Sequence, residues 1–203
     1  MMLNYNRLAN QLTLFRLILA LVFIALMQVD RAAFATAGLF VFAVASITDI
    51  YDGRLARMAG KSSNFGAYFD PLADKVLVSA ALIVLAATPY LAIPTWMAIV
   101  VIAREFLVTG LRVVGASRGV MMKAETLGKV KTIFQMVALN FILAELAVLM
   151  YLRESFPGLV LAESVQAGLT VFYQLLMWGI VVLALWSGIG YFVRHAKLVA
   201  DDF

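Results

Sequence analysis

Residues 76–103 read VLVSAALIVLAATPYLAIPTWMAIVVIA and contain no charged side chain. This run of 28 residues is longer than the roughly 20 that one helix needs to cross a bilayer. It is interrupted by Thr88-Pro89 and by Pro94, and proline suits the first turn of a helix, where its missing N–H group costs nothing. The run therefore predicts a helix that ends near Ala87, a tight turn, and a second helix that begins near Pro94.

The whole chain is nearly as apolar as this run. Hydrophobic residues make up 64% of its 203 residues and charged residues 14%, whereas a soluble domain has about 45–50% and about 25%. The mean hydropathy is +0.97. These values exclude an ordinary soluble globule, a disordered chain and a nucleic-acid-binding module. The lack of cysteine excludes disulfides and zinc–thiolate sites.

Further uncharged runs divide the chain into six predicted spans, with no alternation typical of strands. One acid, Glu145, lies inside the fifth run. We predict an all-α integral membrane protein with a single domain over residues 1–203. Its N-terminal segment, 1–11, is expected to be amphipathic and to lie on the membrane surface. The spans are predicted at about 12–29, 32–52, 66–87, 94–115, 129–152 and 165–193.

The positive charges predict the orientation of these spans. Of the 16 Lys and Arg residues, all but Arg31 and Arg153 fall on the side of the termini. Positively charged loops face the cytoplasm in most membrane proteins. We therefore expect a multi-pass protein whose two termini and second and fourth loops are cytoplasmic.

Four aspartates gather where the second and third spans meet the cytoplasm. Asp49 and Asp52 lie one turn apart near the end of the second helix, and Asp70 and Asp74 lie one turn apart in the third. A short loop makes the two helices antiparallel, so the pairs can face each other. Four such carboxylates would repel one another unless cations lay between them. Oxygen ligands without His or Cys suit Mg²⁺ or Mn²⁺, and such a cluster can hold two ions.

These residues belong to a longer pattern. It runs Asp49-x-x-Asp52-Gly53-x-x-Ala56-Arg57, then eight residues, then Gly66-x-x-x-Asp70-x-x-x-Asp74. This pattern resembles the signature of the CDP-alcohol phosphotransferase family at every position. Arg54 stands where a smaller or polar residue is expected, but it occupies no position of the pattern.

The resemblance implies transfer of a phosphatidyl group from CDP-diacylglycerol to an alcohol, with release of CMP, in a cavity that faces the cytoplasm. It implies that the four aspartates hold two divalent cations and that Asp74 is also the catalytic base. It further implies a homodimer in a bacterial cytoplasmic membrane. Carried over residue by residue, the contacts to CDP-diacylglycerol are expected from Asn10, Thr13, Gly53, Ala56, Arg57, Ser63 and Gly66.

A second set of charged residues bears on the acceptor alcohol. Arg104 and Arg112 lie on the fourth helix, and Lys129 and Lys131 open the fifth. Arg104 follows ten uncharged residues that begin at Pro94, and it precedes Glu105, so we expect it to face the interior of the bundle. Two cations on each of two neighbouring helices favour a phosphorylated acceptor.

Local segments also look like the branch of the family whose acceptor is sn-glycerol 3-phosphate. They are Asn10-x-x-Thr13-x-x-Arg16, Asp70-Pro71-Leu72-Ala73-Asp74-Lys75, Ala103-Arg104-Glu105-Phe106 and Gly128-Lys129-Val130-Lys131-Thr132. Cardiolipin synthases and inositol-phosphate transferases of the same superfamily stay open as alternatives. A divalent-cation transporter is a remoter alternative, because the carboxylates cluster at one end instead of lining a path across the membrane.

Overall fold

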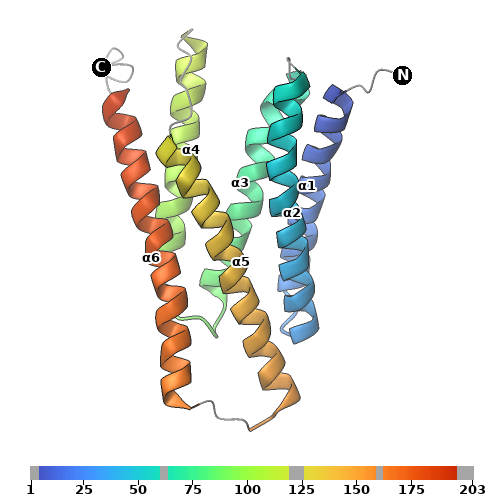
Figure 1. Cartoon of the computed structure of the whole chain (residues 1–203), viewed down its shortest axis with the longest axis vertical. Helices are drawn as coiled ribbons and strands as arrows, with labels where there is room; N and C mark the ends of the chain where they lie inside the picture. Colours follow the sequence, from blue (N-terminus) through green and yellow to red (C-terminus); the bar gives the residue numbers. More distant parts are fainter. Residues whose placement is uncertain (1–4, 60–63, 119–125, 159–161, 196–203) are drawn as a thin grey trace.

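The computed structural model describes residues 5–59, 64–118, 126–158 and 162–195, and their side chains over 11–48, 75–116, 118, 126–158 and 162–195. The described part is all α-helical, as predicted, and contains no strand. Its six helices are α1 (Tyr5–Met27), α2 (Ala32–Ala59), α3 (Asn64–Ala87), α4 (Thr95–Ser117), α5 (Thr126–Ser155) and α6 (Glu163–Arg194). Consecutive helices run in opposite directions, so the start of α1 and the end of α6 lie at the same end of the bundle (Figure 1).

The ends of the helices follow from local sequence. Pro94 is the N-cap of α4, with φ −62°, and α3 ends at Ala87, as the two prolines of this region predict. The α5–α6 connection turns at Gly158, whose φ of 99° is one that glycine adopts without steric cost. No glycine or proline interrupts residues 5–27. The N-terminal segment is therefore continuous with the first helix from Tyr5 onwards.

Each helix packs against at least two others. α1 packs against α2 and α3, and α5 packs against α2 and α6, while α4 contacts α3 and α6. The buried core includes Phe23 and Phe42, whose ring centroids lie 5.6 Å apart. Between lipid-facing helices such close van der Waals packing, and not the exclusion of water, supplies most of the association energy.

The outer surface of the bundle is also apolar. Val193, Trp186 and Ile133 are 70%, 66% and 66% exposed. Soluble monomers rarely expose so much apolar surface. Two helices, Thr126–Ser155 and Glu163–Arg194, are long and apolar enough to cross a membrane, each with a mean hydropathy of 2.0. Shorter apolar stretches cover Gln11–Met27, Ala32–Thr48 and Lys75–Ala87. These features are those of a membrane protein.

The contact between α5 and α6 depends on a glycine. A Cβ at position 179 would lie 2.7 Å from Cζ of Phe134, closer than van der Waals contact allows, whereas one at Gly168 would meet no atom within 4 Å. We predict that Gly179→Ala lowers the free energy of unfolding by about 1–3 kcal/mol, because the Phe134 ring must shift. The matched change Gly168→Ala should leave it equal or higher, since alanine favours the helix. Unfolding in mixed detergent micelles measures both. Equal stability of the two variants would contradict this packing.

Candidate functional site

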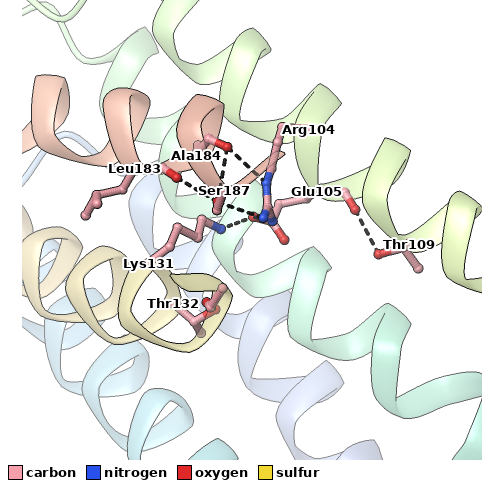
Figure 2. A network of polar contacts seen from close by, with 9 residues as sticks. Arg104, Glu105, Thr109, Lys131, Thr132, Leu183, Ala184 and Ser187 are labelled. Atoms are coloured by element: carbon pink, nitrogen blue, oxygen red, sulfur yellow. Dashed lines mark hydrogen bonds and ion pairs between the residues drawn. The ribbon is translucent and has the colours of Figure 1, made fainter. Parts of the chain in front are cut away.

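Three charged side chains meet inside the bundle where α4, α5 and α6 approach one another (Figure 2). Glu105 of α4 accepts hydrogen bonds from Lys131 of α5 and, at 3.3 Å, from Nη1 of Arg104. The Lys131 side chain is 2% exposed, and those of Arg104 and Glu105 are 14% and 17% exposed. The Glu105 carboxylate therefore pairs with two cations, and both cations are largely shielded from water.

Helix α6 accepts two further hydrogen bonds from Arg104. Its Nη2 donates to Oγ of Ser187 at 2.8 Å, and its Nε donates to the carbonyl oxygen of Ala184 at 3.2 Å. Gly188 lets this happen, because a Cβ at that position would lie 2.9 Å from Cγ of Arg104. The arginine is thus fixed in place by two helices, as expected for a residue facing the interior.

A small hollow of about 20 Å³ opens beside this network between α3, α4 and α5. It is large enough for about one water molecule. Its lining includes Lys75, Glu105, Lys131 and Gln135. Gln135 is 2% exposed, and its Nε2 has no hydrogen-bond partner among the described residues. A buried amide donor without a partner costs about 1–3 kcal/mol unless a bound molecule accepts from it.

The other two cations predicted for the acceptor lie apart from this network. Arg112 is two turns further along α4, exposed, and donates from Nε to the hydroxyl oxygen of Tyr191 at 3.2 Å. Its guanidinium also lies 5.3 Å from the centre of that ring. Lys129 is exposed and is two residues from the buried Lys131, so the two point to different sides of α5. The structure thus brings Arg104 and Lys131 together, with Arg112 and Lys129 at the outside.

Of the predicted contacts to the donor, only Thr13 has a described side chain. It is 2% exposed on α1, and Arg16 one turn later is also 2% exposed. Both therefore face the interior of the bundle, not lipid. The side chains predicted to bind metal or donor at the α2–α3 end lie outside the described residues, as does that of Asn10. These are Asp49, Asp52, Gly53, Ala56, Arg57, Gly66, Asp70 and Asp74, and Ser63 lies outside altogether.

The backbone nevertheless shows where most of these positions lie. α2 continues as one helix through Asp49 and Arg57 to Ala59, and α3 already includes Gly66. The two pairs of aspartates therefore stand on adjoining ends of two helices joined by four residues, at the same end of the bundle as the start of α1 and the end of α6 (Figure 1). Elsewhere among the described side chains, no group of three or more His, Cys, Asp or Glu could hold a metal ion.

Comparison with known proteins agrees with the sequence pattern. The family described as CDP-alcohol phosphatidyltransferase matches residues 6–186. The chain belongs to this family.

Three bacterial relatives have similar sequences over most of the chain. A protein of Bacillus subtilis named CDP-diacylglycerol–glycerol-3-phosphate 3-phosphatidyltransferase is 42% identical over 78% of this chain and 73% of its own length. A probable phosphatidylglycerophosphate synthase of Mycobacterium tuberculosis is 40% identical over 69% of this chain and 67% of its own. A Rickettsia typhi protein with the same name as the Bacillus relative is 37% identical over 68% of this chain and 76% of its own.

Two features of this CDP-alcohol phosphatidyltransferase were not predicted from its sequence. The hydroxyl of Ser187 accepts a hydrogen bond from Arg104, and Ser187 stands beside Gly188 in an apolar stretch of α6. This serine–glycine pair is the local sequence signal that could have indicated the contact. The sequence indicates only part of the role of Glu105. Arg104 beside it in sequence suggested one ion pair, but Lys131 lies 26 residues away.

We predict that Glu105→Gln lowers the free energy of unfolding by about 1–3 kcal/mol, because it removes the negative charge that pairs with the poorly hydrated cations of Arg104 and Lys131. Adding Lys131→Met should recover part of this loss, since it removes one of those cations. Glu163→Gln, at the exposed first residue of α6, should cost less than about 1 kcal/mol. Unfolding in mixed micelles tests all three. A Glu105→Gln protein as stable as Glu163→Gln would contradict a structural role for the network.

Proposed function

We propose that this chain transfers the phosphatidyl group of CDP-diacylglycerol to sn-glycerol 3-phosphate, which gives phosphatidylglycerophosphate and CMP. Family membership supports the phosphatidyl transfer, and the names of the bacterial relatives support this acceptor. The proposed enzyme is a single domain that crosses a bacterial cytoplasmic membrane six times, with both termini and the active site cytoplasmic. The lopsided distribution of its Lys and Arg residues supports this orientation. A homodimer is proposed from the family resemblance alone.

One observation carries the choice of a phosphorylated acceptor. Glu105 and Lys131 line a hollow together with Lys75, and Arg104 is bound to Glu105 outside that lining. Lys75 directly follows Asp74, the proposed base. Through the backbone of α3, Lys75 therefore connects the lining of this hollow to the proposed base. A dianionic acceptor suits a site where several cations lie close together. Arg112 and Lys129 lie outside this network, so we propose them as contacts to the acceptor's phosphate on the basis of the sequence alone.

The proposed metal ligands fit divalent cations by their chemistry. Asp49, Asp52, Asp70 and Asp74 offer only carboxylate oxygens, which suit Mg²⁺ or Mn²⁺, and they stand on adjoining helix ends. Two bound ions would supply positive charge beside the diphosphate of the donor. We propose that Asn10, Thr13, Gly53, Ala56, Arg57, Ser63 and Gly66 bind CDP-diacylglycerol.

The proposed reaction is a direct displacement. The free hydroxyl of the acceptor forms a bond to the phosphorus that carries diacylglycerol, and the bond from that phosphorus to the oxygen of CMP breaks. Asp74 takes the hydroxyl proton, because an alcohol has a pKa far above 7 and needs a proton acceptor. Arg57 balances charge on the departing CMP. No cysteine is present to act as a covalent nucleophile.

We predict that Asp49→Asn, Asp70→Asn or Asp74→Asn each lowers kcat/KM by at least about a thousandfold, as expected when a ligand or base charge is lost. Asp30→Asn is the matched control, because Asp30 lies in the α1–α2 connection at the opposite end of the bundle. It should retain near-normal turnover. The measurement is CMP release from CDP-diacylglycerol with added Mg²⁺. Activity should also stop in chelator and return with Mg²⁺. Near-normal turnover of an Asp49 or Asp70 variant would refute the metal site.

We predict that glycerol 3-phosphate is the preferred acceptor, because its phosphate pairs with the buried cations and plain glycerol has no such group. Purified protein, CDP-diacylglycerol and Mg²⁺ are offered glycerol 3-phosphate, plain glycerol, phosphatidylglycerol, inositol phosphate and serine in turn. The rate with glycerol should be at least about a hundredfold lower. A preference for phosphatidylglycerol, inositol phosphate or serine would change the acceptor and leave the family assignment intact.

A further inference from the structure

A second pocket lies at the end of the bundle opposite the aspartates. It has a volume of about 480 Å³ and is formed by α5, α6 and the connection between α3 and α4. This volume falls in the range of small-molecule sites, about 300–1,000 Å³. On α5, Glu145 of this pocket lies 14 residues, or about 21 Å of helix axis, beyond Lys131 of the charged network. The pocket is therefore separate from the proposed active site, and a ligand bound in it does not depend on the proposed function.

Glu145 lines this pocket and is the acid that interrupts the apolar part of α5. It is only 9% exposed, and neither carboxyl oxygen has a hydrogen-bond partner among the described residues. Burying such a group without a partner costs several kcal/mol. Ionisable residues inside membrane proteins are rare for this reason and mark functional sites. A ligand in the pocket that donates hydrogen bonds to the Glu145 carboxylate would offset this burial cost.

The walls around Glu145 are mostly neutral. Gln166, Thr170 and Tyr173 line the pocket from α6 at helical spacing, together with apolar side chains. The Tyr173 hydroxyl oxygen accepts the N–H of Ala92 at 3.0 Å, which fastens the α3–α4 connection to α6. The polar groups of the pocket lining thus include one acid, an amide and hydroxyl groups.

A positive charge stands near the rim. Arg153 lines the same pocket, is exposed, and has its guanidinium 4.7 Å from the ring centre of Tyr90. Tyr90 in turn donates from its hydroxyl to Asp30 at 2.7 Å. That hydrogen bond raises the pKa of the Tyr90 hydroxyl and positions the ring beside Arg153.

These groups do not suit a metal ion. Ca²⁺ and Mg²⁺ need about six or more oxygens, usually from several carboxylates. The described lining has one carboxylate, and Arg153 would repel a dication. An ammonium group needs only three acceptors. The carboxylate of Glu145 and the oxygens of Gln166 and Thr170 offer that number, with tyrosine rings nearby.

We propose that this pocket binds a small zwitterion, whose ammonium group pairs with Glu145 and whose anionic group pairs with Arg153. Eight residues of α5 separate the two side chains, or about 12 Å of helix axis, which the long arginine side chain shortens. A small molecule whose two charged groups lie a few bonds apart can span the distance that remains between the carboxylate and the guanidinium. The shared chemistry is that of an amino-alcohol phosphate, either free in solution or as the head group of a phospholipid.

The test uses the purified full-length protein in detergent free of phospholipid. Phosphoethanolamine is titrated by calorimetry, and phosphatidylethanolamine is added for native mass spectrometry. At least one of the two should bind saturably. Glu145→Gln and Arg153→Gln should each weaken binding at least tenfold, because each removes one charge of the pair. Glu163→Gln, an acid at the same end of the bundle outside the pocket lining, should bind as the unaltered protein does.

The two arms identify the source of the ligand. Binding of phosphoethanolamine alone indicates a soluble zwitterion, and binding of phosphatidylethanolamine alone indicates a lipid head group. Absence of saturable binding in both arms overturns the proposal. So does a Glu145→Gln or Arg153→Gln protein that binds as tightly as the unaltered one, because the probe would then occupy other cations such as Arg104 and Lys131. Arg153 is exposed, so its replacement keeps the test valid if Glu145→Gln fails to fold.

Discussion

In a chain with so few charged residues and so much apolar surface, each charged side chain that is buried away from water needs a partner. Arg104 and Lys131 meet this constraint through one carboxylate, Glu105, and Arg104 also uses Ser187 and the carbonyl of Ala184. Such a network contributes little net stability compared with apolar packing, but removing one member leaves a charge without compensation. The network therefore fixes the relative positions of α4, α5 and α6 more than it strengthens the bundle.

That positioning connects the network to the proposed chemistry. The hollow beside Glu105 and Lys131 is closed on the α3 side by Lys75, one residue beyond the aspartate pattern. Any change in how α4 and α5 lie relative to α3 would move these cations relative to Asp74. Catalysis by proximity tolerates little such movement, because reacting groups must be held within a fraction of an ångström. A rigid ion network is thus a suitable support for a site built on three helices.

Much of the fold could be predicted from the sequence, because its signals are local. Pro94 and the uncharged run before it marked the α3–α4 turn, and the aspartate spacing identified the family. The partners of buried charges were harder to predict. A soluble helix shows its inner face by apolar periodicity, but in α6 both faces are apolar, as the exposed Trp186 and the buried Ile180 illustrate. Small residues such as Gly179 and Gly188 mark the inner face there, and only the structure shows which side chain fills each gap.

The two buried acids, Glu105 and Glu145, show how differently one constraint can be met. Glu105 lies where cations from its own chain surround it, so its site is complete as folded. Glu145 lies in a pocket with no partner for its carboxyl oxygens among the described residues, and the nearest positive side chain in the lining stands at the rim. An acid of the first kind acts by positioning the cations that it pairs with, because its own charge is already balanced within the chain. An acid of the second kind offsets its desolvation cost only when it takes up a proton or binds a ligand. A ligand that supplies the missing donors therefore gains the most binding energy at such a group. The unsatisfied acid is therefore the better guide to an unassigned site than the charged network that first attracts attention.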